Sequence, residues 1–189
     1  MRPKAIDDEL GLQIVARGDE PVTADIVFVH GLYGHQIGNW RLNDVFWPRD
    51  LLAKDLPNAR MMSFGYKSSP SAFLNNLSNS SLLKLAIMFL SELGAKREAT
   101  KEMKRPIIFI GHCLGDLIIK DALCKAYQNQ LYGDNPAGAT ILESTKGLVF
   151  FGTPHRADIG NWDETITCVA STWPRQHGND ALAALKDGE

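Results

Sequence analysis

The chain has 189 residues, of which 44% are hydrophobic and 22% are charged, and its formal net charge is −2. This composition is ordinary for a soluble globular protein with a sizeable core, and it excludes a chain that attracts nucleic acid through bulk positive charge. We therefore expect a single domain over residues 1–189, with residues 1–10 forming a flexible N-terminal extension.

Targeting and metal-binding signals are the next features to consider. The start, MRPKAIDDEL, lacks the apolar core of a secretory signal, and the longest apolar run, 85–90, is too short to span a bilayer. The cysteines Cys113, Cys124 and Cys168 form no CxxC pair and no zinc-type spacing. These features predict an intracellular, cytosolic chain with no transmembrane segment, no metal and no cofactor.

Short apolar segments alternate with longer helical patterns along the chain. Four segments are continuous apolar runs, typical of parallel strands covered on both faces: 25–30, 59–64, 106–110 and 147–151. A weaker segment, 12–16, is predicted to be an antiparallel edge strand. Helices are predicted at 47–56, 72–97, 114–130 and, more weakly, 179–186, with loops at 66–71 and 132–139. The alternation predicts an α/β fold, with a mostly parallel sheet and helices on both faces.

The third of these apolar strands ends in a distinctive turn, Gly111-His112-Cys113-Leu114-Gly115. A strand, a tight turn between small residues and an immediate helix make up a nucleophile elbow, which usually reads glycine-x-serine-x-glycine. Here Cys113 takes the nucleophile position, and Gly111 and Gly115 let the turn close. The alternative is a strand-to-helix turn in which glycine serves packing and the cysteine is a small core residue.

A second glycine-containing turn, His30-Gly31-Leu32-Tyr33-Gly34, closes the predicted strand 25–30. In α/β-hydrolases such a loop supplies one oxyanion N–H group, and the residue after the nucleophile supplies the other. We therefore expect the backbone N–H groups of Leu32 and Leu114 to form an oxyanion hole, with Gly31 and Gly34 shaping the loop. His30 is interpreted as a structural histidine that braces the loop.

Four ordered motifs carry a resemblance to a known family: DIVFVHGLYGH, WPRDLLAKDLPNARMMSFGY, RPIIFIGHCLGDLIIKDAL and TKGLVFFGTPHR. Together they run from about Asp25 to Arg156. This stretch resembles the serine-active-site-containing, DUF676-type lipase-like family of α/β-hydrolases, above all its fungal members. Those members often precede NACHT, ankyrin or other repeat regions. The usual elbow of the family reads GHSLGG, so this chain departs from it at Cys113 and at Asp116.

The resemblance implies hydrolysis of a carboxylic ester, including a lipid ester, through an acyl-enzyme with cysteine in place of serine. It also implies association with mitochondrial or endoplasmic reticulum membranes and fusion to NACHT or ankyrin-type domains. Dienelactone hydrolases, which share the fold, use an elbow cysteine. The start of the helix should favour the Cys113 thiolate, whereas Asp116 in the first turn opposes it. Asp116 is equally an ordinary helix-start residue.

The remaining members of a catalytic triad are not evident. In this fold the nucleophile is followed by an acid and then a histidine, and only His155 and His177 follow Cys113. His155 and Asp158 are the base and acid candidates by order alone. The last two strands of a complete fold are not apparent, so the domain looks partial and truncated at its C-terminus. An alternative function is therefore a catalytically impaired module, serving as a sensing, effector or interaction domain of a larger NLR-like protein.

Overall fold

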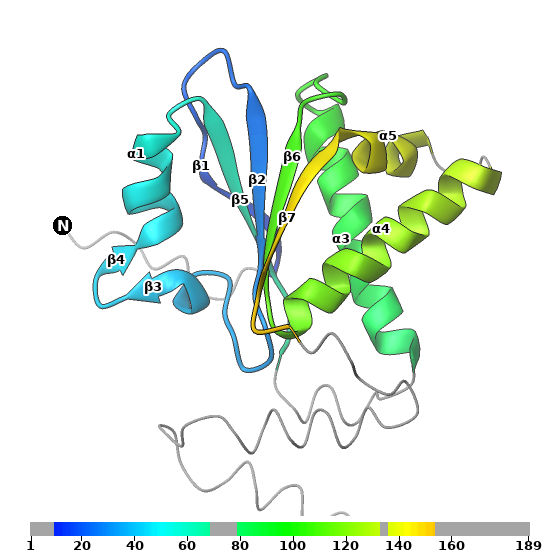
Figure 1. Cartoon of the computed structure of the whole chain (residues 1–189), viewed down its shortest axis with the longest axis horizontal. Helices are drawn as coiled ribbons and strands as arrows, with labels where there is room; N and C mark the ends of the chain where they lie inside the picture. The colour runs from blue at the N-terminus through cyan, green and yellow to red at the C-terminus, as the bar shows by residue number, and fades with distance from the viewer. Residues whose placement is uncertain (1–9, 69–78, 133–135, 154–189) are drawn as a thin grey trace, which may run out of the picture.

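A five-stranded sheet forms the centre of the computed structural model, which describes residues 10–68, 79–132 and 136–153. Its strands in spatial order are β1 (Gly11–Ala16), β5 (Ala59–Gly65), β2 (Ala24–Val29), β6 (Ile107–His112) and β7 (Thr145–Phe151). Strands β5, β2, β6 and β7 are parallel, whereas β1 pairs antiparallel with β5 (Figure 1). The predicted mostly parallel sheet and its antiparallel edge strand are confirmed.

The register between β2 and β6 decides which loops meet. Val29 is paired with Gly111 at the carboxyl ends of the two strands. Parallel strands end at the same edge of a sheet, where open α/β sheets bind ligands. The two glycine-containing turns, 30–34 and 111–115, therefore lie side by side, although about 80 residues separate them in the sequence.

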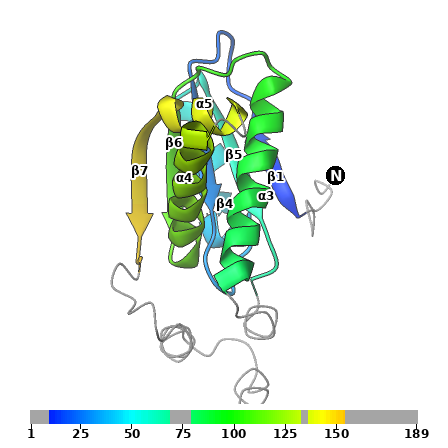
Figure 2. The same ribbon diagram turned by 90° about the vertical axis from the view of Figure 1, so that its right-hand side faces the viewer.

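Helices cover both faces of the sheet, as predicted. One face is covered by α3 (Asn79–Glu98), α4 (Leu114–Tyr132) and α5 (Pro136–Ser144), which stand in front of the sheet in Figure 2. The other face is covered by a π-helix, η2 (Pro48–Leu52), which continues into α1 (Ala53–Asp55). None of the helices in the described ranges has the length and apolar character needed to cross a membrane.

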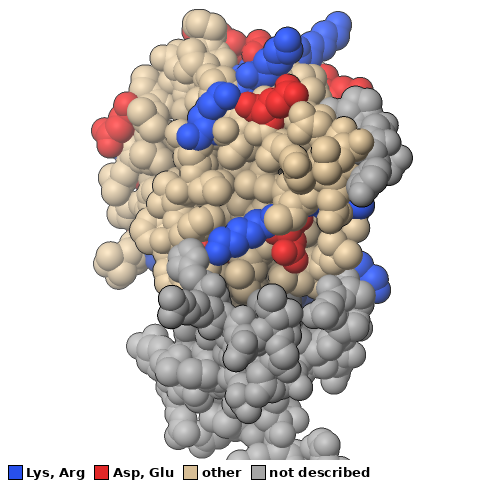
Figure 3. Space-filling view, turned by 45° about the vertical axis from the view of Figure 1, so that its right-hand side comes forward, with Lys and Arg blue, Asp and Glu red and all other residues tan. Residues whose placement is uncertain are grey.

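Strand β7 is the outer strand of the described sheet, and it exposes apolar side chains. Leu148, Val149 and Phe151 are 42%, 39% and 47% exposed. Figure 3, in which the α4 side comes forward, shows a broad uncharged area across the described surface. An exposed apolar edge strand is a feature that native proteins usually cover.

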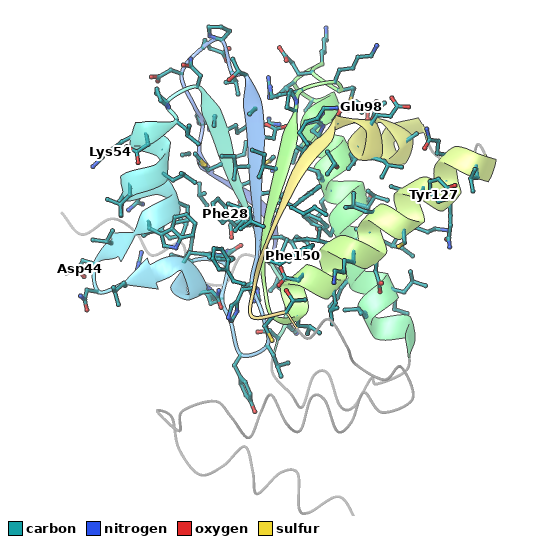
Figure 4. The ribbon with its side chains drawn as sticks, viewed as in Figure 1. Phe28, Asp44, Lys54, Glu98, Tyr127 and Phe150 are labelled. Atoms are coloured by element: carbon teal, nitrogen blue, oxygen red, sulfur yellow. The ribbon has the colours of Figure 1, made fainter. Side chains whose placement is uncertain are left out.

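The core divides into two clusters because successive side chains of a strand point to opposite faces. Val27 and Val29 pack with α3 and α4, in a cluster that includes Phe89, Phe109 and Ile118. Phe28 points to the α1 side (Figure 4), where its ring centroid lies 5.3 Å from those of Trp40 and Trp47. Full burial on both faces accounts for the continuous apolar runs in the sequence.

Two local predictions need correction, and two short elements were missed. The loop predicted at 132–139 is wrong, because α4 extends to Tyr132 and α5 begins at Pro136, a residue well suited to a first helical position. The single helix predicted at 47–56 is a π-helix followed by one short α-helical turn. A 3-10 helix, η1 (Gly38–Trp40), and a hairpin of β3 (Arg41–Leu42) with β4 (Val45–Phe46) were not predicted, because two-residue strands leave no periodic pattern.

Some predicted segments are not placed. The first part of the helix predicted at 72–97, the weak helix at 179–186 and the N-terminal extension at 1–9 lie outside the described residues.

A buried ionic cluster ties the elements together at the opposite, amino end of the sheet. The Asp25 carboxylate, at the start of β2, accepts hydrogen bonds from Arg60 (2.8 Å), Arg97 (2.6 Å) and Arg105 (3.3 Å). Asp25 and Arg97 are fully buried, and Arg105 also contacts the half-exposed Glu102 at 3.1 Å. One carboxylate thus joins β2 to β5, to the end of α3 and to the segment before β6.

Replacing Asp25 with asparagine should strongly destabilise the fold. The Asp25→Asn variant keeps the side-chain size but leaves three buried guanidinium groups without their shared anion, so we expect a loss of about 3–5 kcal/mol in the free energy of unfolding. Glu102→Gln is the matched control, because Glu102 is half exposed and should cost less than about 1 kcal/mol. Chemical denaturation measures both, and equal losses would contradict the account.

Candidate active site

Cys113 lies in the turn between β6 and α4, at the carboxyl edge of the sheet. Its φ is +53°, in the left-handed region that residues with a side chain rarely adopt. Its backbone N–H donates to the carbonyl of Phe151 at 2.8 Å, and its carbonyl accepts from the N–H of Asp116 at 3.3 Å. The side chain is 8% exposed. This strained, hydrogen-bonded turn is the backbone geometry of a nucleophile elbow.

Two glycines allow α4 to approach the loop after β2. A Cβ on Gly115 would lie 2.2 Å from the carbonyl oxygen of Val29 and 2.5 Å from that of His30. A Cβ on Gly31 would lie 2.9 Å from the Cβ of Cys113. No side chain fits at either position, so the two turns contact each other directly through their backbones.

Two backbone donors converge on the Cys113 sulfur. The N–H groups of Leu114 and Leu32 both hydrogen-bond to it, and these bonds lower the pKa of the thiol. Burial raises that pKa by more, and the charge of Asp116 raises it further, so the pKa of Cys113 lies above its ordinary value. The donors are those that the sequence pattern assigned to an oxyanion hole, and that role stays a prediction.

His30 braces the loop after β2 through both of its ring nitrogens. The N–H of Tyr66 donates to Nε2 at 3.3 Å, so the ring proton lies on Nδ1, 3.0 Å from the carbonyl oxygen of Gly31. The Tyr66 ring stacks on the imidazole at 4.2 Å, and its hydroxyl donates to the His30 carbonyl at 2.7 Å. Burial lowers the pKa of His30 to about 4. The imidazole is therefore neutral and fully engaged, which agrees with a structural role.

The same loop is tied to the segment that follows β5. The N–H of Tyr33 donates to the carbonyl of Ser68 at 2.9 Å, and the Ser68 hydroxyl donates to the carbonyl of Gly34 at 2.7 Å. A Cβ on Gly34 would lie 2.8 Å from the carbonyl oxygen of Gly31, so this turn also requires glycine. The loop that carries the Leu32 N–H is thus fixed in advance, as electrostatic stabilisation of a developing charge requires.

Asp116 and Thr153 form a second polar contact at the elbow. The Asp116 carboxyl is fully buried, and its Oδ2 accepts a short hydrogen bond from the Thr153 hydroxyl. Burial raises the pKa of Asp116 to about 6, although Thr153 and the nearby Lys120 oppose this. Thr153 was missed by the sequence reasoning, and its place inside the motif FFGTPHR was the available signal.

The proposed base and acid are not placed, because His155 and Asp158 lie outside the described residues. The other histidines near the turns have different surroundings. His35 Nδ1 accepts from the N–H groups of Ile37 and Gly38, and burial lowers the pKa of His112. Within the described part of the chain, no three side chains gather in a way that would hold a metal ion.

A cavity lies beside the loop after β2, at the same edge of the sheet. Its volume is about 320 Å³, and Leu10, His30, His35, Gln36, Gly65, Tyr66 and Lys67 line it. His30 and Tyr66 thus form part of its wall while they support the loop that carries the Leu32 N–H.

Curated relatives match most of this chain but only a part of their own length. The human protein SERAC1 is 30% identical over 157 residues, which cover 74% of this chain and 23% of the relative. The Danio rerio protein SERAC1 is 28% identical over 172 residues, which cover 82% and 25%. The chain therefore spans about a quarter of the length of these relatives. No family model matches the sequence.

A solved structure shows the fold independently. It is that of a serine-to-alanine mutant of YbtT, a type II thioesterase from a yersiniabactin NRPS/PKS biosynthetic pathway. The superposition has a TM-score of 0.50 at 15% sequence identity and covers 91% of this chain and 63% of the thioesterase. Together with the parallel sheet and its covering helices, this likeness shows that the chain has an α/β-hydrolase fold.

The strained backbone at Cys113 predicts an unusual order of stabilities. Because φ is positive there, Cys113→Gly should be about 1 kcal/mol more stable than Cys113→Ala. The exposed Cys124, within α4, gives the matched control, and there the glycine variant should be about 1 kcal/mol less stable than the alanine variant. Urea denaturation of the four variants measures the two differences, and the same sign at both positions would refute the elbow conformation.

The neutral state of His30 predicts a dependence of stability on pH. The folded protein holds this imidazole unprotonated down to about pH 4, whereas the unfolded chain protonates it near 6.5. Acidification therefore favours the unfolded state, and the difference between the two values corresponds to about 3 kcal/mol. The stability advantage of the wild type over His30→Asn should shrink by about this amount between pH 7 and pH 4. An advantage that is constant over this pH range would contradict the prediction.

Proposed function

We propose that this α/β-hydrolase domain transfers the acyl group of a carboxylic ester or thioester to Cys113. The observation that carries the proposal is the convergence of two backbone N–H groups, those of Leu32 and Leu114, on the Cys113 sulfur. A pair of fixed donors beside a nucleophile suits a reaction in which negative charge develops on a carbonyl oxygen. Because they are backbone groups held by the sheet, they need no rearrangement when the charge appears.

The chemical step is nucleophilic substitution at the acyl carbon. The Cys113 thiolate attacks the carbonyl carbon, a carbon–sulfur bond forms, and the carbonyl electron pair moves onto the oxygen beside the two donors. Collapse of this intermediate breaks the bond to the alcohol or thiol leaving group, which takes a proton from water. The product is a thioester on Cys113, and water must then attack it to complete hydrolysis.

Hydrolysis of the thioester on Cys113 is expected to be the slow step of the reaction. Water attack needs a general base, and His30 is neutral with both ring nitrogens in hydrogen-bond contact. We assign the base and acid to His155 and Asp158, the candidates given by sequence order. The proposal also includes a lipid ester as substrate and an association with mitochondrial or endoplasmic reticulum membranes. Both are taken from the family resemblance.

A second candidate function is a non-catalytic interaction module of a larger protein, for example one with NACHT or ankyrin-type domains. The exposed apolar side chains of β7, at the edge of the described sheet, support it. Such an edge is normally packed against further polypeptide, which another domain would supply. The length of the curated relatives, about four times the matched stretch, also agrees with this second function.

Hydrolysis of p-nitrophenyl butyrate tests the first candidate. We expect a burst of up to one equivalent of p-nitrophenol, a butyryl adduct on Cys113 by intact mass, and little turnover afterwards. Cys113→Ala should show no burst, and Cys113→Ser should also fail, because a serine hydroxyl depends even more on a base than a thiol does. Cys124→Ala is the matched control and should keep the burst.

Two results would change the interpretation of that experiment. Sustained turnover that Cys113→Ala abolishes would show that an effective base is present, and His155→Ala would then be the first variant to measure. No burst and no adduct would favour the interaction module.

A further inference from the structure

The side chain of Asp116 is in a costly environment. It is 0% exposed and lies in the first turn of α4. Oδ2 accepts the hydrogen bond from Thr153, but Oδ1 has no hydrogen-bond partner among the residues that the structure describes. Burial of a carboxylate that is only half satisfied is unfavourable. A helix-start role alone does not explain it, because a carboxylate at the surface interacts favourably with the helix dipole without the cost of burial.

The contacts of Asp116 place its charge inside the elbow. Oδ1 lies so close to Gly111 that a Cβ there would be 1.8 Å away, and Gly111 is two residues before Cys113. The Asp116 N–H also donates to the carbonyl of Cys113. The carboxyl is therefore enclosed between the end of β6, the first turn of α4 and Thr153, which follows β7. From this buried position, where water screens charges poorly, the negative charge of Asp116 raises the pKa of the Cys113 thiol.

The other titratable groups near this carboxyl do not cancel its effect on the thiol. Lys120, one turn further along α4, is an opposite charge, but its ammonium lies over the ring of Phe150 at 5.0 Å. Tyr66, which follows β5, is neutral, because burial raises its pKa and the charges of Cys113 and Asp116 raise it further. Partial burial lowers the pKa of His112, next to Cys113. No buried cation adjoins the sulfur within the described ranges.

We propose that Asp116 is an electrostatic brake on Cys113. Its buried carboxylate, held in place by Thr153, disfavours negative charge on the sulfur and on the oxyanion that would form beside it, and so it slows acylation. The family that this chain resembles has glycine at this position. Asp116 instead places a negative charge near the sulfur and the oxyanion, both of which carry negative charge during the reaction. This inference rests on the proposed function only in taking Cys113 as the nucleophile.

The brake can be measured without any ester. In the full 189-residue chain with Cys124→Ser and Cys168→Ser, Cys113 is alkylated by iodoacetamide, whose neutral charge avoids steering. The thiolate displaces iodide, so the rate as a function of pH reports the ionisation of Cys113. Asp116→Asn should raise the rate at pH 7 by about three- to tenfold and move the profile to lower pH, which corresponds to a shift of one half to one pKa unit.

Asp121→Asn is the matched control, because it removes a carboxylate from the same helix farther from the elbow, and its profile should not move. If Asp116→Asn does not fold, Thr153→Val replaces it. Loss of that hydrogen bond favours the neutral carboxyl and should also speed alkylation at pH 7. Identical profiles for the parent chain, the Asp116→Asn or Thr153→Val variant and the control would overturn the brake.

The experiments distinguish a failure of the electrostatic brake from a failure of acyl transfer to Cys113. A shifted alkylation profile without any acyl adduct would retain the brake and reject acyl transfer. An acyl adduct with an unshifted profile would do the reverse. If Asp116 served only the stability of α4, Asp116→Asn would lower the melting temperature and leave the alkylation profile of Cys113 unchanged.

Discussion

The direct backbone contact between the start of α4 and the end of β2 is the constraint on which the candidate site depends. Gly115 faces the carbonyl oxygens of Val29 and His30 at distances that leave no room for a side chain. This contact brings the Leu32 N–H to the same sulfur that the Leu114 N–H reaches. Any larger residue at position 115 would push the helix away and separate the two donors. The elbow, the donors and the enclosed Asp116 are thus consequences of one close approach.

The two ends of the sheet differ in whether their buried ionisable groups are paired with opposite charges. At the amino end, three arginines surround the Asp25 carboxylate and pair with it directly. At the carboxyl end, the buried groups near Cys113 have no such partner, so burial raises the pKa of Cys113 and Asp116 and lowers that of His30. The first arrangement fixes the fold, and the second favours the neutral forms of Cys113 and His30.

The environment of Cys113 affects the chemistry that the site can perform. A rigid turn with preset backbone donors is suited to stabilising a transient oxyanion, whereas a thiol that is largely protonated reacts slowly. The described part of the site therefore combines two backbone donors at the Cys113 sulfur with a thiol whose pKa is raised. Such a combination is compatible with slow acylation and with a module that has kept the architecture of a hydrolase. The likeness to the thioesterase structure supports the architecture and leaves the chemistry to experiment.

The sequence by itself determined the features that depend on local pattern. Continuous apolar runs predicted the four parallel strands, and glycines at fixed spacing predicted the turn at Cys113 and the turn at Leu32. These residues act through backbone conformation and through burial on both faces, which neighbours in the sequence reveal.

Other features were decided only by the tertiary structure, because they arise between residues far apart in the chain. Asp25 meets Arg97 across 72 positions, and Asp116 meets Thr153 across 37. The sequence left Asp116 as either a helix-start residue or an opponent of the thiolate. Its burial against Gly111 is set by the packing of α4 on the sheet and by the pairing of β6 with β7, and packing over such distances has no local signature in the order of the residues.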